Sequence, residues 1–277
     1  MIPVAALLML LSGAAHAVVN TILKSGGDKM AGRALIDGSS ALIVLPFAFF
    51  VPLPHGAWQW LAASMVIHLV YLISLIKAFE GAELNAVYPI MRGVAPALAA
   101  VVAVLVLGDT VNAAIIAGIA LVSAGTMAIA FWRPPKRSAV AWALLTGATI
   151  AAYTVIDAKG ARAAPSAASY IVWGFLFLGS GIGTIFAVWR GKTFFVQAKQ
   201  QWKPGVLAGA LSIVSYGAAL WSYRLGDVPR LAALRETSIV FGVILAALVL
   251  HEKVTRARAV SAAIIAAGAV ILVAAPT

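Results

Sequence analysis

Apolar stretches about 20 residues long follow one another along almost the entire chain. A helix that crosses a lipid bilayer needs about 20 mainly apolar residues. The joints between the stretches are short, and the longest of them, residues 190–203, leaves no room for a soluble domain. The sequence therefore predicts an all-α polytopic membrane protein with ten transmembrane helices. The predicted spans are residues 3–23, 34–52, 57–79, 84–107, 111–132, 139–157, 168–189, 204–223, 229–250 and 257–275.

The composition agrees with this reading and excludes the main alternatives. Of 277 residues, 63% are apolar and only 10% are charged, whereas about 25% of the residues in a soluble domain are charged. A soluble fold cannot cover so much apolar surface, and a disordered chain needs low hydrophobicity. The chain has no cysteine, which removes disulfides, thiolate catalysis and cysteine-ligated zinc.

The net charge of +11 is distributed in a way that predicts membrane orientation. Of the 20 lysines and arginines, 14 lie in odd-numbered joints, four lie in even-numbered joints and two lie inside spans. The positive-inside rule places the odd joints in the cytoplasm, so both termini are expected outside it. The excess charge then reflects topology in the bilayer, and no nucleic-acid partner is expected.

The first span has two readings. Residues 7–11 followed by Ala15-His16-Ala17 resemble a secretory signal with a small-residue cleavage site. No basic residue precedes the apolar run, however, and this segment has a counterpart later in the chain. We expect an uncleaved helix.

The chain repeats itself. Residues 10–26 align without gaps on 144–160, and residues 92–109 align on 235–252. Each half holds five predicted spans, so the second copy must enter the membrane from the opposite side. We expect one membrane domain over 1–277, built from a five-helix repeat at 1–133 and a second, inverted five-helix repeat at 138–277 around a central cavity. Inverted repeats are typical of secondary transporters, whose substrate site lies near the bilayer midplane.

Each half closes with an aliphatic run, an acid and a final glycine-containing helix. The matching segments are ALAAVVAVLVLGDTV at 97–111 and VFGVILAALVLHEKV at 240–254. In this the chain resembles the EamA branch of the drug/metabolite transporter superfamily. The resemblance implies a basket of helices around a cavity and export of amino acids or other small metabolites across the inner membrane. Two features depart from the family pattern: Ile239 stands opposite Pro96, and the first acid is Asp109 rather than glutamate.

Two arginines inside predicted spans are the first candidates for substrate contacts. Arg92 and Arg235 hold equivalent repeat positions, about eight residues into their helices. Ionisable groups at this depth are costly and face a cavity or a partner. They either hold a substrate carboxylate or form structural ion pairs, with Glu236, Glu80, Glu83 or Asp227 as possible partners. Glu236 is either a fixed counter-ion or a proton carrier, and no second deep carboxylate is expected to support proton coupling.

Aromatic and amide side chains complete the expected cavity. Tyr88 and Arg92 lie four residues apart and share a helix face, and Pro89 loosens the helix between them. The further candidates are Tyr71, Tyr153, Tyr216, Trp221 and Asn20. Packing between helices is the competing role for each aromatic residue.

Asp37 is expected to interact with the dipole at the start of its helix. With four histidines and no acid beside His16 and Asn20, neither a metal nor a cofactor is expected.

Three function classes are open to a polytopic membrane protein. A membrane-embedded enzyme needs paired acids, a zinc-binding helix or a serine with a base, and the sequence has none of these patterns. A channel needs a filter motif, which is missing. A carrier for a small molecule is expected, with amino acids favoured by the resemblance. A small organic anion, held by the two embedded arginines, is the alternative. The oligomeric state is left open.

Overall fold

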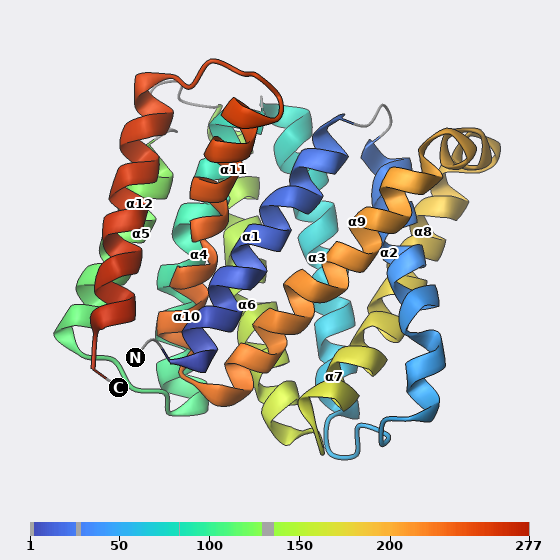
Figure 1. Cartoon of the computed structure of the whole chain (residues 1–277), viewed down its shortest axis with the longest axis horizontal. Coiled ribbons are helices and arrows are strands. Elements are labelled where there is room, and N and C mark those ends of the chain that lie inside the picture. Colours follow the sequence, from blue (N-terminus) through green and yellow to red (C-terminus); the bar gives the residue numbers. More distant parts are fainter. Residues whose placement is uncertain (1–2, 26–28, 83, 129–135, 277) are drawn as a thin grey trace.

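The computed structural model describes residues 3–25, 29–82, 84–128 and 136–276. All regular structure within these residues is helical. The helices cross the molecule in roughly one direction and form a single bundle, with both ends of the chain at the same end of it (Figure 1).

The first half of the chain forms six helical elements: α1 (Val4–Ser25), α2 (Lys29–Val44), η1 (Leu45–Phe49), α3 (Trp58–Gly81), α4 (Leu84–Leu107) and α5 (Ala113–Ala128). The second half forms eight: α6 (Arg137–Ala163), α7 (Ala167–Gly174), η3 (Phe175–Gly179), α8 (Ser180–Arg190), α9 (Lys192–Leu225), α10 (Val228–Arg235), α11 (Thr237–Leu248) and α12 (Arg256–Ala274).

These helices confirm a multi-pass membrane protein. In the part of the chain that the structure describes, nine helical stretches are long and apolar enough to cross a bilayer. The apolar helix Ala113–Ala128 is shorter. The fifth predicted span, 111–132, extends into residues 129–132, which lie outside the described residues. Ten full spans therefore remain a prediction.

Three predicted segments differ from the structure, one at its boundary and two within the span. Residues 192–203, predicted as part of a joint, belong to the 34-residue helix α9, which continues through Pro204. The span predicted at 229–250 is interrupted at Glu236, between α10 and α11. The span predicted at 168–189 contains the π-helical segment η3 between α7 and α8. In the first case the charged residues and the proline predicted a helix boundary, although charged turns can extend a membrane helix into the interface.

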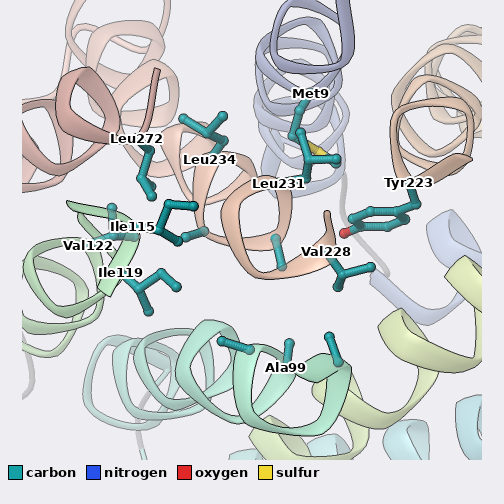
Figure 2. Close-up of a cluster of buried hydrophobic side chains, with 14 of the residues drawn as sticks. Met9, Ala99, Ile115, Ile119, Val122, Tyr223, Val228, Leu231, Leu234 and Leu272 are labelled. Carbon is teal, nitrogen blue, oxygen red and sulfur yellow. The ribbon is translucent and has the colours of Figure 1, made fainter. Parts of the chain in front are cut away.

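The largest apolar core joins both halves of the chain. Figure 2 shows Met9 of α1, Ala99 of α4, Ile119 of α5, Leu231 of α10 and Leu272 of α12 around one point. All five are at most 6% exposed. Lipid tails are as apolar as these side chains, so the cluster stabilises the bundle through close packing rather than through removal from water.

Helix α2 packs closely against glycines of two neighbouring elements, η3 and α9. A Cβ on Gly179 would lie 2.6 Å from the Asp37 carbonyl oxygen, and one on Gly209 would lie 3.1 Å from that of Ile36. The Ser40 hydroxyl donates to the Gly209 carbonyl across 3.0 Å. This close approach needs glycine at both contacts and fixes the position of Asp37 beside the centre of the bundle.

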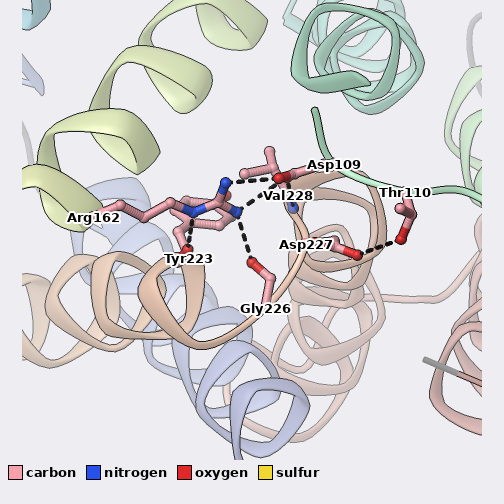
Figure 3. A network of polar contacts seen from close by, with 7 residues as sticks. All are labelled: Asp109, Thr110, Arg162, Tyr223, Gly226, Asp227 and Val228. Carbon is pink, nitrogen blue, oxygen red and sulfur yellow. Dashed lines mark hydrogen bonds and ion pairs between the residues drawn. The ribbon is translucent and has the colours of Figure 1, made fainter. Parts of the chain in front are cut away.

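A polar network closes the end of the bundle that holds the chain termini. Arg162, at the end of α6, makes two hydrogen bonds to the Asp109 carboxylate, at 2.7 and 3.1 Å (Figure 3). Its guanidinium also donates to the carbonyl oxygens of Tyr223 and Gly226, each at 2.9 Å. The Val228 N–H donates to Asp109 across 2.7 Å. The network joins the end of α4 to the end of α6 and the start of α10.

Candidate functional site

A cavity of about 120 Å³ lies inside the bundle. Its walls come from α1, α2, α3, α6, α7, η3, α8, α9 and α10, and so from both halves of the chain. An engineered cavity of about 150 Å³ holds a benzene ring. The space therefore suits a compact molecule.

The π-helical segment η3 forms part of this wall. Phe175 and Gly179, its first and last residues, both line the cavity. A π segment inserts one residue into the helical repeat and changes which side chains face inward, and such segments are frequent at functional sites.

A buried carboxylate faces the cavity from α6. Asp157 is 1% exposed, and its two oxygens accept hydrogen bonds from different tyrosines. The Tyr170 hydroxyl of α7 donates to Oδ1 across 2.9 Å, and the Tyr216 hydroxyl of α9 donates to Oδ2. No described lysine or arginine forms an ion pair with Asp157.

A buried guanidinium faces the same cavity from the end of α10. Arg235 is 8% exposed, and its guanidinium lies over the Tyr216 ring, 5.1 Å from the ring centroid. Its Nε has no hydrogen-bond partner among the described residues. Tyr216 therefore contacts both buried charges, Arg235 through its ring face and Asp157 through its hydroxyl.

A second pair of charges reaches the cavity from α2. The Arg33 Nε donates to Asp37 Oδ2 across 2.8 Å, at i,i+4 spacing within the helix. The Arg33 side chain is 40% exposed, and that of Asp37 is 9% exposed. The expectation that Asp37 interacts with the start of its helix was wrong, because α2 begins at Lys29 and Asp37 lies two turns further on.

Aromatic rings form an additional wall. The His68 ring stacks on Tyr153 with centroids 4.2 Å apart, and Tyr71 meets Tyr153 edge-on at 5.7 Å. Apolar walls with a few converging polar groups are typical of sites for small molecules.

Arg92 and Glu236 form an ion pair next to this cavity rather than in it. Arg92 Nε lies 3.0 Å from Glu236 Oε2, and Arg92 Nη2 donates to the Ser238 hydroxyl across 3.2 Å. Both residues line a second cavity of only about 10 Å³, which Arg235 also borders. The two arginines at equivalent repeat positions thus have different surroundings: Arg92 is paired, and Arg235 faces the larger space.

The structure brings together four of the nine predicted site residues. Tyr71, Tyr153, Tyr216 and Arg235 line the larger cavity. Arg92 and Glu236 border only the smaller one. The other three lie elsewhere: Tyr88 packs against an apolar cluster of α3, α4 and α6, Trp221 is 48% exposed, and Asn20 is exposed.

Sequence reasoning missed the carboxylates of the cavity. Asp157 was not singled out, although it is an acid within an apolar predicted span, which is a signal in itself. The expectation that no second deep carboxylate accompanies Glu236 was wrong, because Asp37 and Asp157 are both buried. The Arg33–Asp37 pair has the i,i+4 spacing that predicts a contact on a helix.

Comparisons with known proteins give a family and a fold. The model of the EamA-like transporter family matches residues 137–274. No match was found among curated proteins. A crystal structure of a protein with 16% sequence identity superposes with a TM-score of 0.78, over 97% of this chain and 96% of that chain. At this identity the likeness shows the fold alone, and it extends over nearly the full length of both chains.

Proposed function

Because the chain belongs to the EamA-like transporter family of membrane transporters, we propose that it is a secondary carrier for amino acids or similar small metabolites. It exports them across the inner membrane by alternating access between two halves. The family assignment and the absence of enzyme motifs in the sequence both favour transport over catalysis.

The observation that carries this proposal is the cavity with Arg235 at its wall. A guanidinium whose Nε lacks a partner has donors available for a carboxylate, which it can bind in a bidentate manner. Burial strengthens such a contact because water does not compete for it. Tyr153, Tyr71 and Phe175 supply apolar surface for the remainder of a small substrate.

The proposed mechanism uses two inverted five-helix repeats, residues 1–133 and 138–277, with the short helix α5 as part of the fifth of ten crossings. The inverted repeat is supported by α1 and α6, which hold equivalent repeat positions and run in opposite directions. Ser222 of α9 donates to the Ala5 carbonyl at the start of α1, and the neighbouring Tyr223 carbonyl accepts from Arg162 at the end of α6. The start of α1 and the end of α6 therefore lie together (Figure 1). Rocking of one repeat against the other would expose the cavity to each side in turn.

We propose that both termini lie outside the cytoplasm, because basic residues concentrate in the odd-numbered joints. The two termini lie at the same end of the bundle (Figure 1), which is consistent with an even number of crossings. A reporter fused after residue 277 that is active only outside the cytoplasm should give signal. Activity of a cytoplasm-only reporter at this position would contradict the orientation.

A small organic anion is the second candidate substrate. It is supported by Arg235, one of the two embedded arginines, which borders the cavity and forms no ion pair among the described residues.

A counterflow screen in proteoliposomes tests the proposal. Purified protein is reconstituted, and exchange of labelled amino acids and organic acids is measured against concentration. We expect saturable exchange, reduced at least about tenfold in Arg235→Gln, because a hydrogen bond to a charged group contributes about 1.5–3 kcal/mol. Arg256→Gln, which removes the same charge at an exposed position, should exchange normally. Linear, unsaturable flux would indicate a channel instead.

A further inference from the structure

The cavity carries as much negative as positive formal charge. Its charged lining residues are Arg33, Arg235, Asp37 and Asp157. Arg33 and Asp37 neutralise each other across 2.8 Å. Arg92, whose charge had favoured an anionic substrate, is paired with Glu236 and does not line this cavity. With neutral imidazoles the cavity is therefore balanced, which suits a substrate without net charge.

Of the four charges that line the cavity, Arg235 and Asp157 form no ion pair among the described residues. A buried charge without a counter-charge is costly. The Tyr216 ring face partly compensates Arg235, and the hydroxyls of Tyr170 and Tyr216 partly compensate Asp157. Neither compensation neutralises the charge, so each group retains a strong preference for an opposite charge.

The Asp157 carboxylate also retains the capacity to accept more hydrogen bonds. An ionised carboxylate offers about four lone-pair sites, and the two tyrosine hydroxyls occupy one on each oxygen. An ammonium group brings three donors and a full positive charge. The tyrosines hold the carboxylate in place and leave it able to bind such a group.

The two charges contact the same tyrosine. Tyr216 presents its face to Arg235 and its hydroxyl to Asp157, so the cation and the anion both border the cavity beside one aromatic ring. A small zwitterion, with its carboxylate and ammonium groups on one carbon, can present one group to each charge.

We propose that Asp157 is a specificity-determining residue that binds the ammonium group of the substrate while Arg235 binds its carboxylate. This inference rests on the proposed carrier function. It selects a zwitterion over an organic anion, because Asp157 repels an anion and gains nothing from a substrate without the amine.

The first test needs no mutation. Counterflow is compared between aliphatic amino acids and the matching 2-hydroxy acids, which keep the shape and carboxylate but replace the ammonium group by a hydroxyl. We expect wild-type protein to exchange at least one amino acid at least about tenfold faster than its 2-hydroxy analogue. Equal or faster exchange of the hydroxy acids would overturn the role of Asp157 and leave the carrier function standing. Exchange of neither class would overturn both.

The second test separates specificity from structure. Asp157→Asn removes the charge and keeps an oxygen that can accept a tyrosine hydrogen bond. We expect the ratio of amino-acid to hydroxy-acid exchange to fall at least about tenfold in this variant. Glu80→Gln makes the same neutral change on an exposed side chain outside the cavity, so this ratio should stay close to that of the wild type. An unchanged ratio in Asp157→Asn, or an equal fall in Glu80→Gln, would contradict the proposal.

Discussion

The chain turns a corner after α4 and another after α11. The two corners share a backbone conformation but differ in the surroundings of their side chains. Gly108 and His251 both adopt left-handed backbone, with φ of +71° and +53°. The N–H of the next residue, Asp109 or Glu252, then donates to the carbonyl six positions earlier, at 3.4 and 2.9 Å. These positions also coincide in the alignment of residues 92–109 with 235–252. The matching backbone supports the proposed repeat.

The acids at the two corners have opposite surroundings. The Asp109 side chain is 4% exposed and is held by Arg162 and the Val228 N–H (Figure 3). The Glu252 side chain is 32% exposed and meets Lys24 and Arg258, which are 50% and 32% exposed. One end of the bundle is thus closed by a buried network and the other by solvated ion pairs. Buried pairs are costly to break, whereas exposed pairs contribute little.

The largest expected effect is the loss of Arg162. Arg162→Ala leaves the Asp109 carboxylate buried without its counter-charge, which should lower the free energy of unfolding by about 3 kcal/mol. Denaturation of the purified protein in mixed micelles measures this loss. Arg258→Ala, the corresponding deletion at the exposed corner, should cost far less. Equal losses of unfolding free energy in Arg162→Ala and Arg258→Ala would contradict the difference between the buried network and the exposed ion pairs.

A second substitution makes the first prediction sharper. Adding Asp109→Asn to Arg162→Ala removes the uncompensated charge, so the double variant should be more stable than Arg162→Ala alone. This non-additivity is expected only for residues in one network. Additive losses would show that the pair does not act as a unit.

Substitutions of the two residues with left-handed backbone should change the stability of the protein in opposite directions. A Cβ on Gly108 meets nothing within 4 Å, so Gly108→Ala introduces backbone strain alone and should cost about 1 kcal/mol. His251→Gly relieves the same strain at the other corner and should be neutral or stabilising by up to about 1 kcal/mol. Thermal unfolding of both variants checks the signs. Destabilisation by His251→Gly would contradict a strained left-handed backbone at this corner.

The smallest effect is expected for Glu252→Gln, and it should depend on pH. The hydrogen bond from Lys24 is the main cause that lowers the pKa of Glu252 from its ordinary value. A carboxyl with a lowered folded-state pKa stabilises the protein above its unfolded-state pKa, and this contribution is lost as pH falls through the folded value.

The difference in unfolding midpoint between wild type and Glu252→Gln should therefore be constant near neutral pH and vanish below about pH 4, the ordinary range of glutamate. Added salt should also reduce it at neutral pH, because the ion pair is exposed. A difference that persists in acid would show that the glutamine acts through something other than lost charge.

The sequence predicted the helical membrane architecture well, because each span had to be apolar over about 20 residues. It predicted helix ends less well. The charged residues 192–203 continue α9, since lysines and glutamines at a membrane surface are compatible with a helix. The interruption at Glu236 and the π segment η3 depend on packing between helices, and no local pattern marks them.

The candidate site was predicted only in part. Arg235 and the cavity tyrosines were found because polar and aromatic residues inside spans are conspicuous. The sequence could not show which arginine pairs with Glu236, because Arg92 lies 144 positions away and meets it only in the folded bundle. Asp157 depends likewise on Tyr216, which comes from another helix. Position along the chain identifies buried charges, but the three-dimensional fold decides which of them remain available to a substrate.

Substrate protection of a cysteine placed in the cavity is the most direct test of the central claim. The chain has no cysteine, so Ser212→Cys at the cavity wall would be the only thiol in the protein. We predict that an exchanged amino acid slows the labelling of this thiol by a small water-soluble reagent. Its 2-hydroxy analogue should have little effect, and Lys253→Cys, at an exposed position, should label at the same rate with or without substrate. Labelling of the cavity thiol that is indifferent to every exchanged substrate would contradict the account.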